Sequence, residues 1–506
     1  MPSSNMSCMK RCFLFTVLFA FAAHGYRFLS ASFGGDAALL TMHDQALYQV
    51  GLGRFLQPLY WLVRGDLVVP GVVGLFTVLF LALSCLLIAD TLNLSAPRDI
   101  ALLAALLATH ETFAVTSATY LPWMDVYALS LLFALTGASF FLAGGRKAWL
   151  SPLFFLLSLG LYQSYLPCAA ALVILALMRQ TLGGASPVRM LQKGLGACAA
   201  LLAGLVLYAL VLKLTLALTG STASTEYNGV GVIDTFDFAS IPRYLADTVC
   251  TPIRFLFVPN AKAIASHTPF VSPYLNLALL ALCFVMLLPR ARALGKGAKA
   301  ILLLLVLLMI PGVNFVQFIA QGLVSGLTIF AYVFFDIAAL LLASAALKTD
   351  FSLSRVAARC ARLLLCVVVF QNAMLANQLS VKRDLEFSST LSAATRIVEL
   401  AEHTEGYVAG ETPVVLIGML PSSSVSMERP GFEPLSGHQG ARYTYAAAYE
   451  GANYWYFNMI LAQHVNLADN DTMRAISASP EAQAMPRFPA EGCCQMVNGM
   501  LYIRLS

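Results

Sequence analysis

The stretch V-V-P-G-V-V-G-L-F-T-V-L-F-L-A-L-S-C-L-L-I-A, Val68–Ala89, decides the fold class of this chain. It contains no charged side chain, and as an α-helix it is long enough to cross the roughly 30 Å hydrocarbon core of a bilayer. Comparable apolar runs recur along the first three quarters of the sequence. These runs predict a mainly α-helical polytopic membrane protein.

The composition agrees with repeated membrane crossing. Of the 506 residues, 59% are hydrophobic and 11% are charged, whereas roughly a quarter of the residues in soluble domains are charged. The net charge of +5 comes mostly from short basic clusters between the apolar runs. It therefore indicates membrane topology, with the lipid bilayer as a partner, and does not indicate nucleic-acid binding.

Basic residues in short loops mark the cytoplasmic side, because they resist translocation. Lys10 and Arg11 place the N-terminus there, before the apolar run Cys12–Phe28. The tripeptide Ala20-Phe21-Ala22 also fits a signal-peptide cleavage pattern, but the apolar run continues beyond it, which favours a first span.

Applied along the chain, the same rule predicts about eleven spans. The stretch Trp149–Met178 has basic residues on both sides and an interruption at Tyr162–Pro167, so it is expected to fold as a hairpin. The predicted spans are Cys12–Phe28, Val68–Ala89, Ile100–Ser117, Asp125–Ala143, two within Trp149–Met178, Gly194–Leu218, Pro273–Leu288, Ala300–Ile319, Gly322–Ala345 and Leu363–Leu379.

This topology predicts one domain in the inner membrane and a second domain in the periplasm. Residues 1–380 would form the transmembrane domain, with outer loops at 30–67 and 219–267. Residues 381–506 have a soluble composition, with an expected helix at Leu391–His403 and an expected buried strand in Pro413–Leu420. They predict a small α/β domain at a periplasmic C-terminus, in which Cys493 and Cys494 form either a strained disulfide or two separate thiols.

The first outer loop gathers charged candidates for a site. Asp36 follows the flexible pair Gly34 and Gly35, and it is either an active-site carboxylate at the membrane edge or the cap of a following helix. For Asp44 a solvated helix face is the favoured interpretation. Arg54 adds a guanidinium to the same loop.

Acidic and polar residues inside apolar runs are costly, so they are candidates for function. Asp125 begins the fourth span, Glu111 lies near the end of the third, and Gln163 and Tyr165 belong to the hairpin interruption. Helix capping and structural hydrogen bonding are alternatives for each of them, and for the lone acid Asp336.

Three further cations lie in outer loops: Arg243, Arg254 and Lys262. Together with Arg54 they could bind a lipid-linked phosphate, although rim salt bridges are an equal alternative. There is no G-x-x-x-x-G-K-[ST] motif, which argues against a nucleotide substrate, and no His/Cys cluster has zinc spacing.

Four motifs together resemble one known family. They are F-G-G-D-A-A-L-L, G-L-G-R-F-L-Q-P-L-Y-W-L-V-R-G, A-T-Y-L-P-W-M-D-V-Y and L-G-L-Y-Q-S-Y, and they lie within Arg27–Pro167. In these motifs the chain resembles the type II glucosyltransferases, polytopic proteins that modify O-antigen and are similar in architecture to the GT-C class. Gly35 stands where family members often carry His or Asp.

The resemblance implies transfer of a sugar, glucose, from a polyprenyl-phosphate donor to a cell-surface glycan on the periplasmic side. Asp36 would act as the general base, and Arg54 or an outer-loop arginine would stabilise the leaving phosphate. Asp125 would orient the sugar or, with Asp36, hold a divalent cation, Mg or Mn. A donor synthase and a flippase would have to supply the donor.

Three alternatives stay open at this point. A transporter or flippase of lipid-linked sugars would also carry intramembrane acids and broken helices. A glycan ligase or polymerase would use similar donors on the same side, and a structural membrane subunit could use lone acids for packing. The gathering of charged residues at the outer edge favours an enzyme over a transporter.

Overall fold

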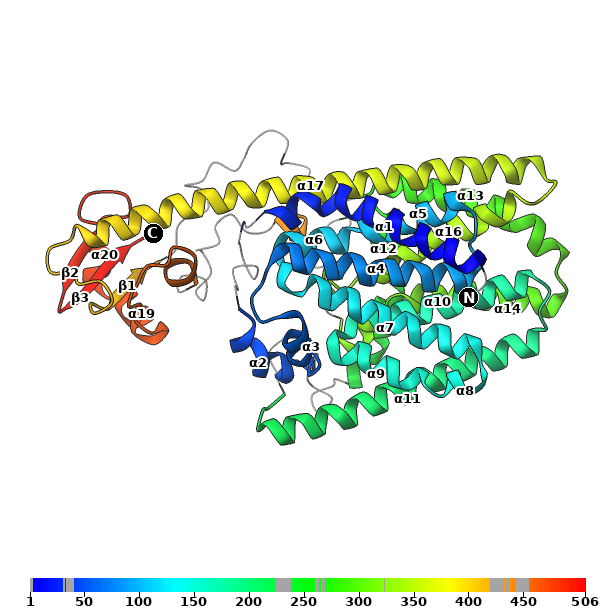
Figure 1. The fold of residues 1–506 in the computed structure, drawn as a ribbon, viewed down its shortest axis with the longest axis horizontal. Coiled ribbons are helices and arrows are strands. Elements are labelled where there is room, and N and C mark those ends of the chain that lie inside the picture. The colour runs from blue at the N-terminus through cyan, green and yellow to red at the C-terminus, as the bar shows by residue number, and fades with distance from the viewer. Residues whose placement is uncertain are drawn as a thin grey trace.

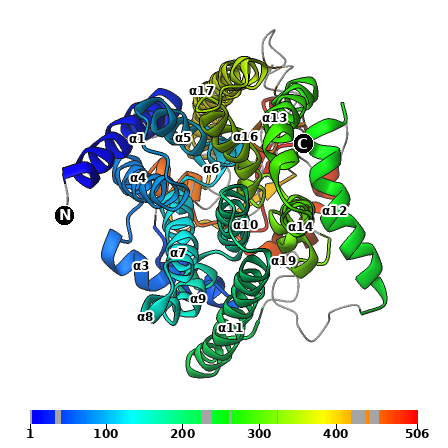
Figure 2. The ribbon, with the colours of Figure 1, turned by 90° about the vertical axis from the view of Figure 1, so that its right-hand side faces the viewer.

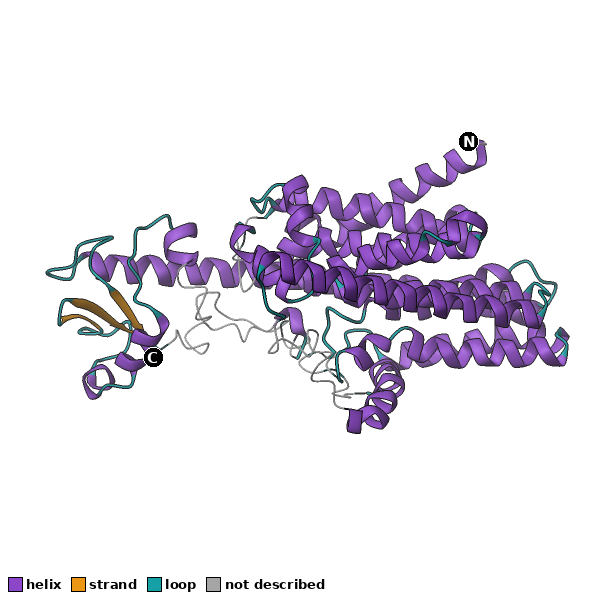
Figure 3. Cartoon of the chain, turned by 90° about the horizontal axis from the view of Figure 1, so that it is seen from below, coloured by secondary structure: helices purple, strands orange, loops and turns teal. Residues whose placement is uncertain are grey.

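The computed structural model describes residues 3–30, 32, 41–223, 238–259, 264, 267, 269–322, 324–418, 432, 435, 437–441 and 455–506. In this part of the chain, helices run side by side in a bundle, and one very long helix leads from the bundle to the C-terminal part (Figure 1). Among the described residues, Figure 3 shows strands at the C-terminal end of the molecule.

Within the described ranges, seven helices are long and apolar enough to cross a membrane. They comprise α1 (Ser3–Leu29), α4 (Pro70–Leu92), α5 (Pro97–Thr109) with α6 (Glu111–Thr119), η3 (Leu121–Trp123) with α7 (Met124–Ala143), η4 (Gln163–Tyr165) with α10 (Leu166–Leu182), α11 (Pro187–Thr219) and α13 (Pro273–Ala293).

Three further apolar helices fall below this length. They are α9 (Ser151–Leu161), α14 (Lys296–Gly312) and α16 (Val333–Ala346), which have 11, 17 and 14 residues. The count of about eleven spans therefore stays a prediction, and the membrane-spanning class is supported by seven helices.

The predicted interruption at Tyr162–Pro167 separates α9 from α10. Viewed along the bundle, α9 lies at its periphery and α10 near its centre (Figure 2). Ser130 on α7 donates to the carbonyl oxygens of Ser158 and Tyr162, at 3.0 Å and 2.9 Å. Pro167 in the first turn of α10 costs no helical hydrogen bond there, so the chain can restart its helix after the break.

Further helices complete the bundle. They are η2 (His43–Gln45), α2 (Ala46–Gly51), α3 (Gln57–Arg64), α8 (Gly145–Ala148), η5 (Phe238–Ser240), α12 (Ile241–Phe257), α15 (Phe315–Ile319) and η6 (Phe330–Tyr332). Figure 1 shows α2 and α3 at the end of the bundle that faces the C-terminal part.

The longest helix, α17 (Ser352–Glu402), has 51 residues and is thus about 75 Å long. It packs on α1, α5, α6, α13 and α16 and then continues beyond the bundle (Figure 1). The predicted domain boundary at residue 380 consequently falls inside a continuous helix.

The C-terminal part contains a three-stranded sheet with the order β1-β3-β2. β3 (Met500–Arg504) pairs parallel with β1 (Val414–Ile417) and antiparallel with β2 (Cys494–Val497). All four residues of β1 are buried, and this strand lies within the predicted strand Pro413–Leu420. Around the sheet lie α19 (Asn470–Ser477), α20 (Pro480–Ala484), the π-helical turn Trp455–Ile460 and the end of α17.

A separate periplasmic domain stays a prediction for this part of the chain. The adjacent Cys493 and Cys494 are free thiols, so of the two expected states the structure has the unpaired one.

Candidate functional site

The segment between α1 and α4 that contains α2 and α3, hereafter the α2–α3 segment, folds onto two breaks between helices, one before α7 at η3 and one before α10 at η4. The amide nitrogen of Gln57 donates to the carbonyl oxygen of Leu161 at 2.7 Å. Arg64 Nη1 donates to the carbonyl oxygen of Pro122 at 2.7 Å. Three sequence motifs that lie far apart in the chain, around residues 57, 122 and 162, are thereby brought to one place.

Asp125 is held by three groups at this junction. Arg64 Nη1 lies 3.2 Å from its Oδ1, and the Tyr60 hydroxyl donates to Oδ2 at 2.8 Å. The backbone N–H of Val126 donates to Oδ1 at 2.9 Å. Burial and the neighbouring carboxylate raise the pKa of Tyr60, so this hydroxyl stays a donor. Asp125 is completely buried, and its contacts fix α3 against the start of α7.

Arg54 lies beside the second break. Its guanidinium carbon is 4.8 Å from the centre of the Tyr162 ring, and Nη1 donates to Gln49 Oε1 at 3.1 Å. A cation on an aromatic face is stabilised by the ring quadrupole. Arg54 is only 7% exposed, so the α2–α3 segment carries a nearly buried cation at this point.

Gln163 joins the same break to the α2–α3 segment. Its amide nitrogen donates to the carbonyl oxygen of Leu52 at 3.0 Å and to the Tyr208 hydroxyl at 2.9 Å. That hydroxyl donates to the carbonyl oxygen of Gly53 at 3.0 Å. A Cβ atom on Gly53, which has a φ of +78°, would lie 2.2 Å from the Tyr208 hydroxyl oxygen, so this close approach requires glycine.

A second polar cluster forms at the start of α6. Glu111 Oε2 lies 3.5 Å from His267 Nε2 and 3.8 Å from His438 Nε2. His267 follows α12, and His438 comes from the C-terminal part of the chain. All three side chains are buried, and their ligand atoms lie within 4.8 Å of one another, so together they could hold a metal ion.

The C-terminal residues of this cluster are anchored on the bundle. Gly326 N–H donates to Gln439 Oε1 at 2.6 Å, and Arg383 Nη2 donates to the carbonyl oxygen of Gly440 at 2.8 Å. Arg383 also donates to Thr119 Oγ1 at 3.0 Å. The turn η9 (Gln439–Ala441) thus packs on α6 and holds His438 beside Glu111.

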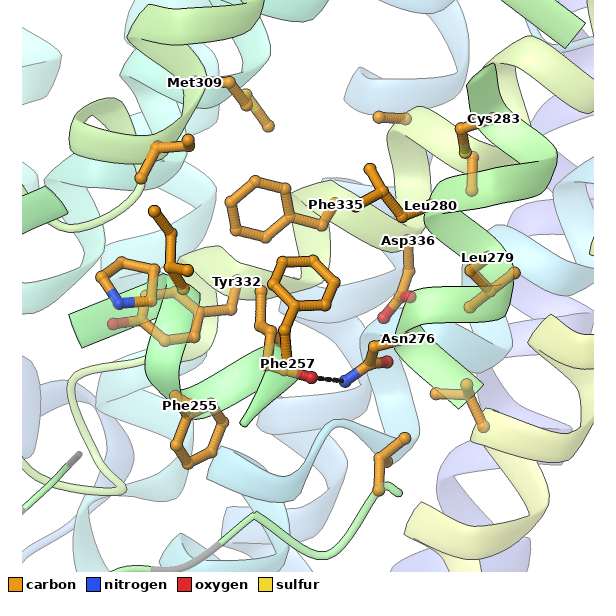
Figure 4. A pocket seen from close by; sticks show the side chains of 18 of the residues that line it. Phe255, Phe257, Asn276, Leu279, Leu280, Cys283, Met309, Tyr332, Phe335 and Asp336 are labelled. Atoms are coloured by element: carbon orange, nitrogen blue, oxygen red, sulfur yellow. Dashed lines mark hydrogen bonds between the residues drawn. The ribbon is translucent and has the colours of Figure 1, made fainter. Parts of the chain in front are cut away.

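A cavity of about 510 Å³ adjoins this cluster (Figure 4). Glu111, Tyr332 and Asp336 line it together with many apolar side chains from α10, α12, α13, α14 and α16. Asn276 also lines it and donates to the carbonyl oxygen of Leu256 at 2.9 Å. The cavity is thus largely apolar, with a few polar groups that include those at the start of α6.

The other predicted site residues lie in several places. Asp36 and Lys262 are outside the described residues, and of Asp44 only the backbone, in η2, is described. Arg243 and Arg254 are exposed on α12, where Arg243 pairs with Asp247 at 3.7 Å. Tyr165 is buried against Phe330, with 5.5 Å between the ring centres. The proposed metal pair of Asp36 and Asp125 stays a prediction.

Several residues of these clusters were not among the predicted site residues, including Arg64, His267 and His438. Arg64 belongs to a motif of the α2–α3 segment, but nothing in its sequence pattern indicates the partner Asp125. His267 and His438 are single histidines separated by 171 positions, which no metal-binding spacing rule connects with Glu111.

The sequence model of the family described as Glucosyl transferase GtrII matches residues 36–343. The match covers more than half of the chain and includes Arg64, Glu111, Asp125 and His267, whereas His438 lies beyond it. No curated protein and no solved structure matches the chain.

Proposed function

Because the chain belongs to the Glucosyl transferase GtrII family, we propose that it moves glucose from a polyprenyl-phosphate donor to a hydroxyl of a cell-surface glycan such as O-antigen. The observation that carries this proposal is the cavity of about 510 Å³ beside Glu111. An isoprenoid chain is apolar and its phosphosugar is polar. The cavity offers both environments in one continuous space.

The lining supports the proposed orientation of such a donor. Leu280, Phe284 and Val306 provide an apolar surface for the lipid chain, whereas Glu111 and Asn276 provide polar groups for the sugar. Pockets for small ligands commonly combine an apolar lining with a few placed polar groups. The phosphosugar would therefore lie toward the start of α6.

In the proposed reaction, the acceptor hydroxyl oxygen bonds to C1 of glucose while the bond from C1 to the phosphate oxygen breaks. The hydroxyl proton passes to a carboxylate, for which Asp36 is our proposal from the family resemblance. Arg54 is proposed to stabilise the phosphate as charge develops on it. For Asp125, whose carboxylate is enclosed by Arg64 and Tyr60, we propose a positioning role.

We further propose that the reaction takes place on the periplasmic side of the inner membrane. Arg146 and Lys147 on α8 lie at one end of the bundle, and α2 and α3 lie at the other (Figure 1). Basic residues in short loops favour the cytoplasmic side, which would direct α2 and α3 outward. A donor synthase and a flippase would then have to supply the donor.

The test uses cells that make and flip polyprenyl-phosphate glucose, with and without the full chain. The expected result is a gain of one hexose per glycan repeat unit by mass spectrometry only when the chain is present. Membranes with radiolabelled donor and isolated glycan should transfer label to the glycan. An unmodified glycan with donor present would contradict the proposal, and donor translocation without transfer would identify a flippase instead.

A further inference from the structure

We propose that Glu111, His267 and His438 bind a divalent transition metal ion, Zn²⁺ in the first instance, at the polar end of the cavity. The three ligands come from α6, from the segment after α12 and from the C-terminal part of the chain. Metal binding itself is independent of the proposed glucosyl transfer. The role of the ion toward a donor phosphate rests on that proposed function.

The spacing of the ligand atoms supports an ion. Two ligand atoms that are each about 2.1 Å from a tetrahedral Zn²⁺ lie about 3.4 Å apart. Glu111 Oε2 is 3.5 Å from His267 Nε2 and 3.8 Å from His438 Nε2. Hydrogen bonds from an imidazole to a carboxylate are shorter, at about 2.7–2.9 Å when charged. These two separations are closer to those of ligands that share one ion, and the three ligand atoms together lie within 4.8 Å of one another.

The burial of the two imidazoles is the second observation. The side chains of His267 and His438 are 0% and 2% exposed. Among the described residues, neither Nε2 atom has a hydrogen-bond partner, although both point at Glu111. A buried polar atom without a partner destabilises the folded state. An ion coordinated by both Nε2 atoms would remove this cost and neutralise the carboxylate.

One pair of contacts opposes ion binding. The backbone N–H groups of Gln439 and Gly440 each lie 3.3 Å from a ring Nδ1, of His267 and His438 respectively. Coordination of an ion through Nε2 places the ring proton on Nδ1. A protonated Nδ1 cannot accept from a backbone N–H, so both of these 3.3 Å contacts would have to open. The competing arrangement is two neutral imidazoles that donate to Glu111 with no ion, and the experiment separates the two.

The ligand set selects the kind of metal. Two imidazoles and one carboxylate suit Zn²⁺ and its transition-metal neighbours, whereas Mg²⁺ and Ca²⁺ prefer oxygen ligands. Three protein ligands leave a fourth position open on zinc. Of the three, Glu111 lines the cavity, so the open position would face that space. A phosphate oxygen of the proposed donor, or water, could bind there.

The experiment measures zinc in the untagged full chain, purified in detergent without donor or glycan. After chelation and re-addition of Zn²⁺, we expect about one ion per chain by elemental mass spectrometry and a higher Tm. Mg²⁺ should leave the Tm unchanged. Because neither substrate is present, failure of glucosyl transfer would not affect this result.

Variants identify the ligands. His267→Ala, His438→Ala and Glu111→Gln should each lose the ion, whereas His438→Cys should keep it because thiolate is a zinc ligand. His403→Ala is the matched control, since this exposed histidine directly follows α17 and its side chain bonds only to the Glu399 carbonyl oxygen in the described structure. Zinc far below one ion per wild-type chain, or equal zinc in His438→Ala, would overturn the proposal.

Discussion

Arg64 on α3 and Asp125 on α7 form a buried ion pair, with 3.2 Å between Nη1 and Oδ1. The two side chains are 1% and 0% exposed. The Tyr60 hydroxyl donates to the same carboxylate. This pair joins two motifs that are 61 residues apart and sets the position of α3 over the helix breaks.

Removal of one partner from this pair should destabilise the protein strongly. In Asp125→Asn the Arg64 charge stays buried without its counter-ion, and loss of one partner of a buried pair costs about 3–5 kcal/mol. We expect a clear fall in Tm in detergent. The double variant Arg64→Leu/Asp125→Leu should be more stable than Asp125→Asn, and the reverse order would contradict a structural ion pair.

Asp36→Asn should reduce activity and leave stability unchanged. If Asp36 is the general base, its loss should reduce glucosyl transfer by about 10²–10⁴-fold, with no change in Tm. Asp471→Asn, which changes an exposed carboxylate on α19, is the control and should retain activity. A mass-spectrometric assay of glycan modification at equal membrane levels of each variant measures the difference. Full activity in Asp36→Asn would remove this residue from the proposed mechanism.

Gly326 should tolerate no side chain, because a Cβ atom there would lie 2.7 Å from His267 Nδ1 and 2.9 Å from Gln439 Oε1. We expect Gly326→Ala to displace the turn η9 and to lower stability by about 1–3 kcal/mol. Gly295→Ala is the control, since its Cβ would meet nothing within 4 Å. Equal melting temperatures for the two variants would show that the turn does not pack here.

The sequence predicted features that depend on local pattern. The apolar run Val68–Ala89 corresponds closely to α4, Pro70–Leu92, and the strand in Pro413–Leu420 contains β1. The hairpin break before α10 was also predicted, because polar residues and a proline interrupt an apolar run.

Long-range partners could not be predicted in the same way. Glu111 was recognised as a costly intramembrane acid, but its partners His267 and His438 reach it only through the folding of distant segments. The boundary at residue 380 followed a change from apolar to polar composition. The helix α17 nevertheless continues to Glu402, because its polar second half packs on the C-terminal sheet through residues such as Ile397.

Without a metal ion, docking of η9 should weaken in acid. Burial, with a smaller effect of His267, lowers the pKa of His438 to about 4, below its unfolded value of about 6.5. A group whose pKa is lower in the folded state than in the unfolded state contributes its full stability at pH values above the unfolded pKa. This contribution is lost as the pH falls from the unfolded pKa to the folded pKa. Proteolysis near residue 438 should therefore accelerate between about pH 6.5 and pH 4.

His438→Gln should remove this acceleration, because glutamine does not titrate. Chelator is present throughout, so that metal release does not contribute. An acceleration of the same size in His438→Gln would assign the pH dependence to other groups.

The cavity provides the most direct test of donor binding. Leu280 lines the cavity (Figure 4). Leu277 lies on the same helix, α13, and is not among the residues that line the cavity. Leu280→Trp should fill part of the cavity and raise the KM for a long-chain polyprenyl donor by about tenfold, which corresponds to about 1.4 kcal/mol. Leu277→Trp adds the same indole to the same helix but outside the cavity, so it should leave the KM unchanged.

A donor with a truncated lipid separates this effect from general damage. Its shorter chain would occupy less of the apolar space, so Leu280→Trp should discriminate against it less than against the long donor. Kinetics in detergent with both donors and a fixed glycan measure the ratio. If Leu280→Trp and Leu277→Trp give the same KM with the long donor, the lipid binds elsewhere, and the cavity beside Glu111 has another occupant.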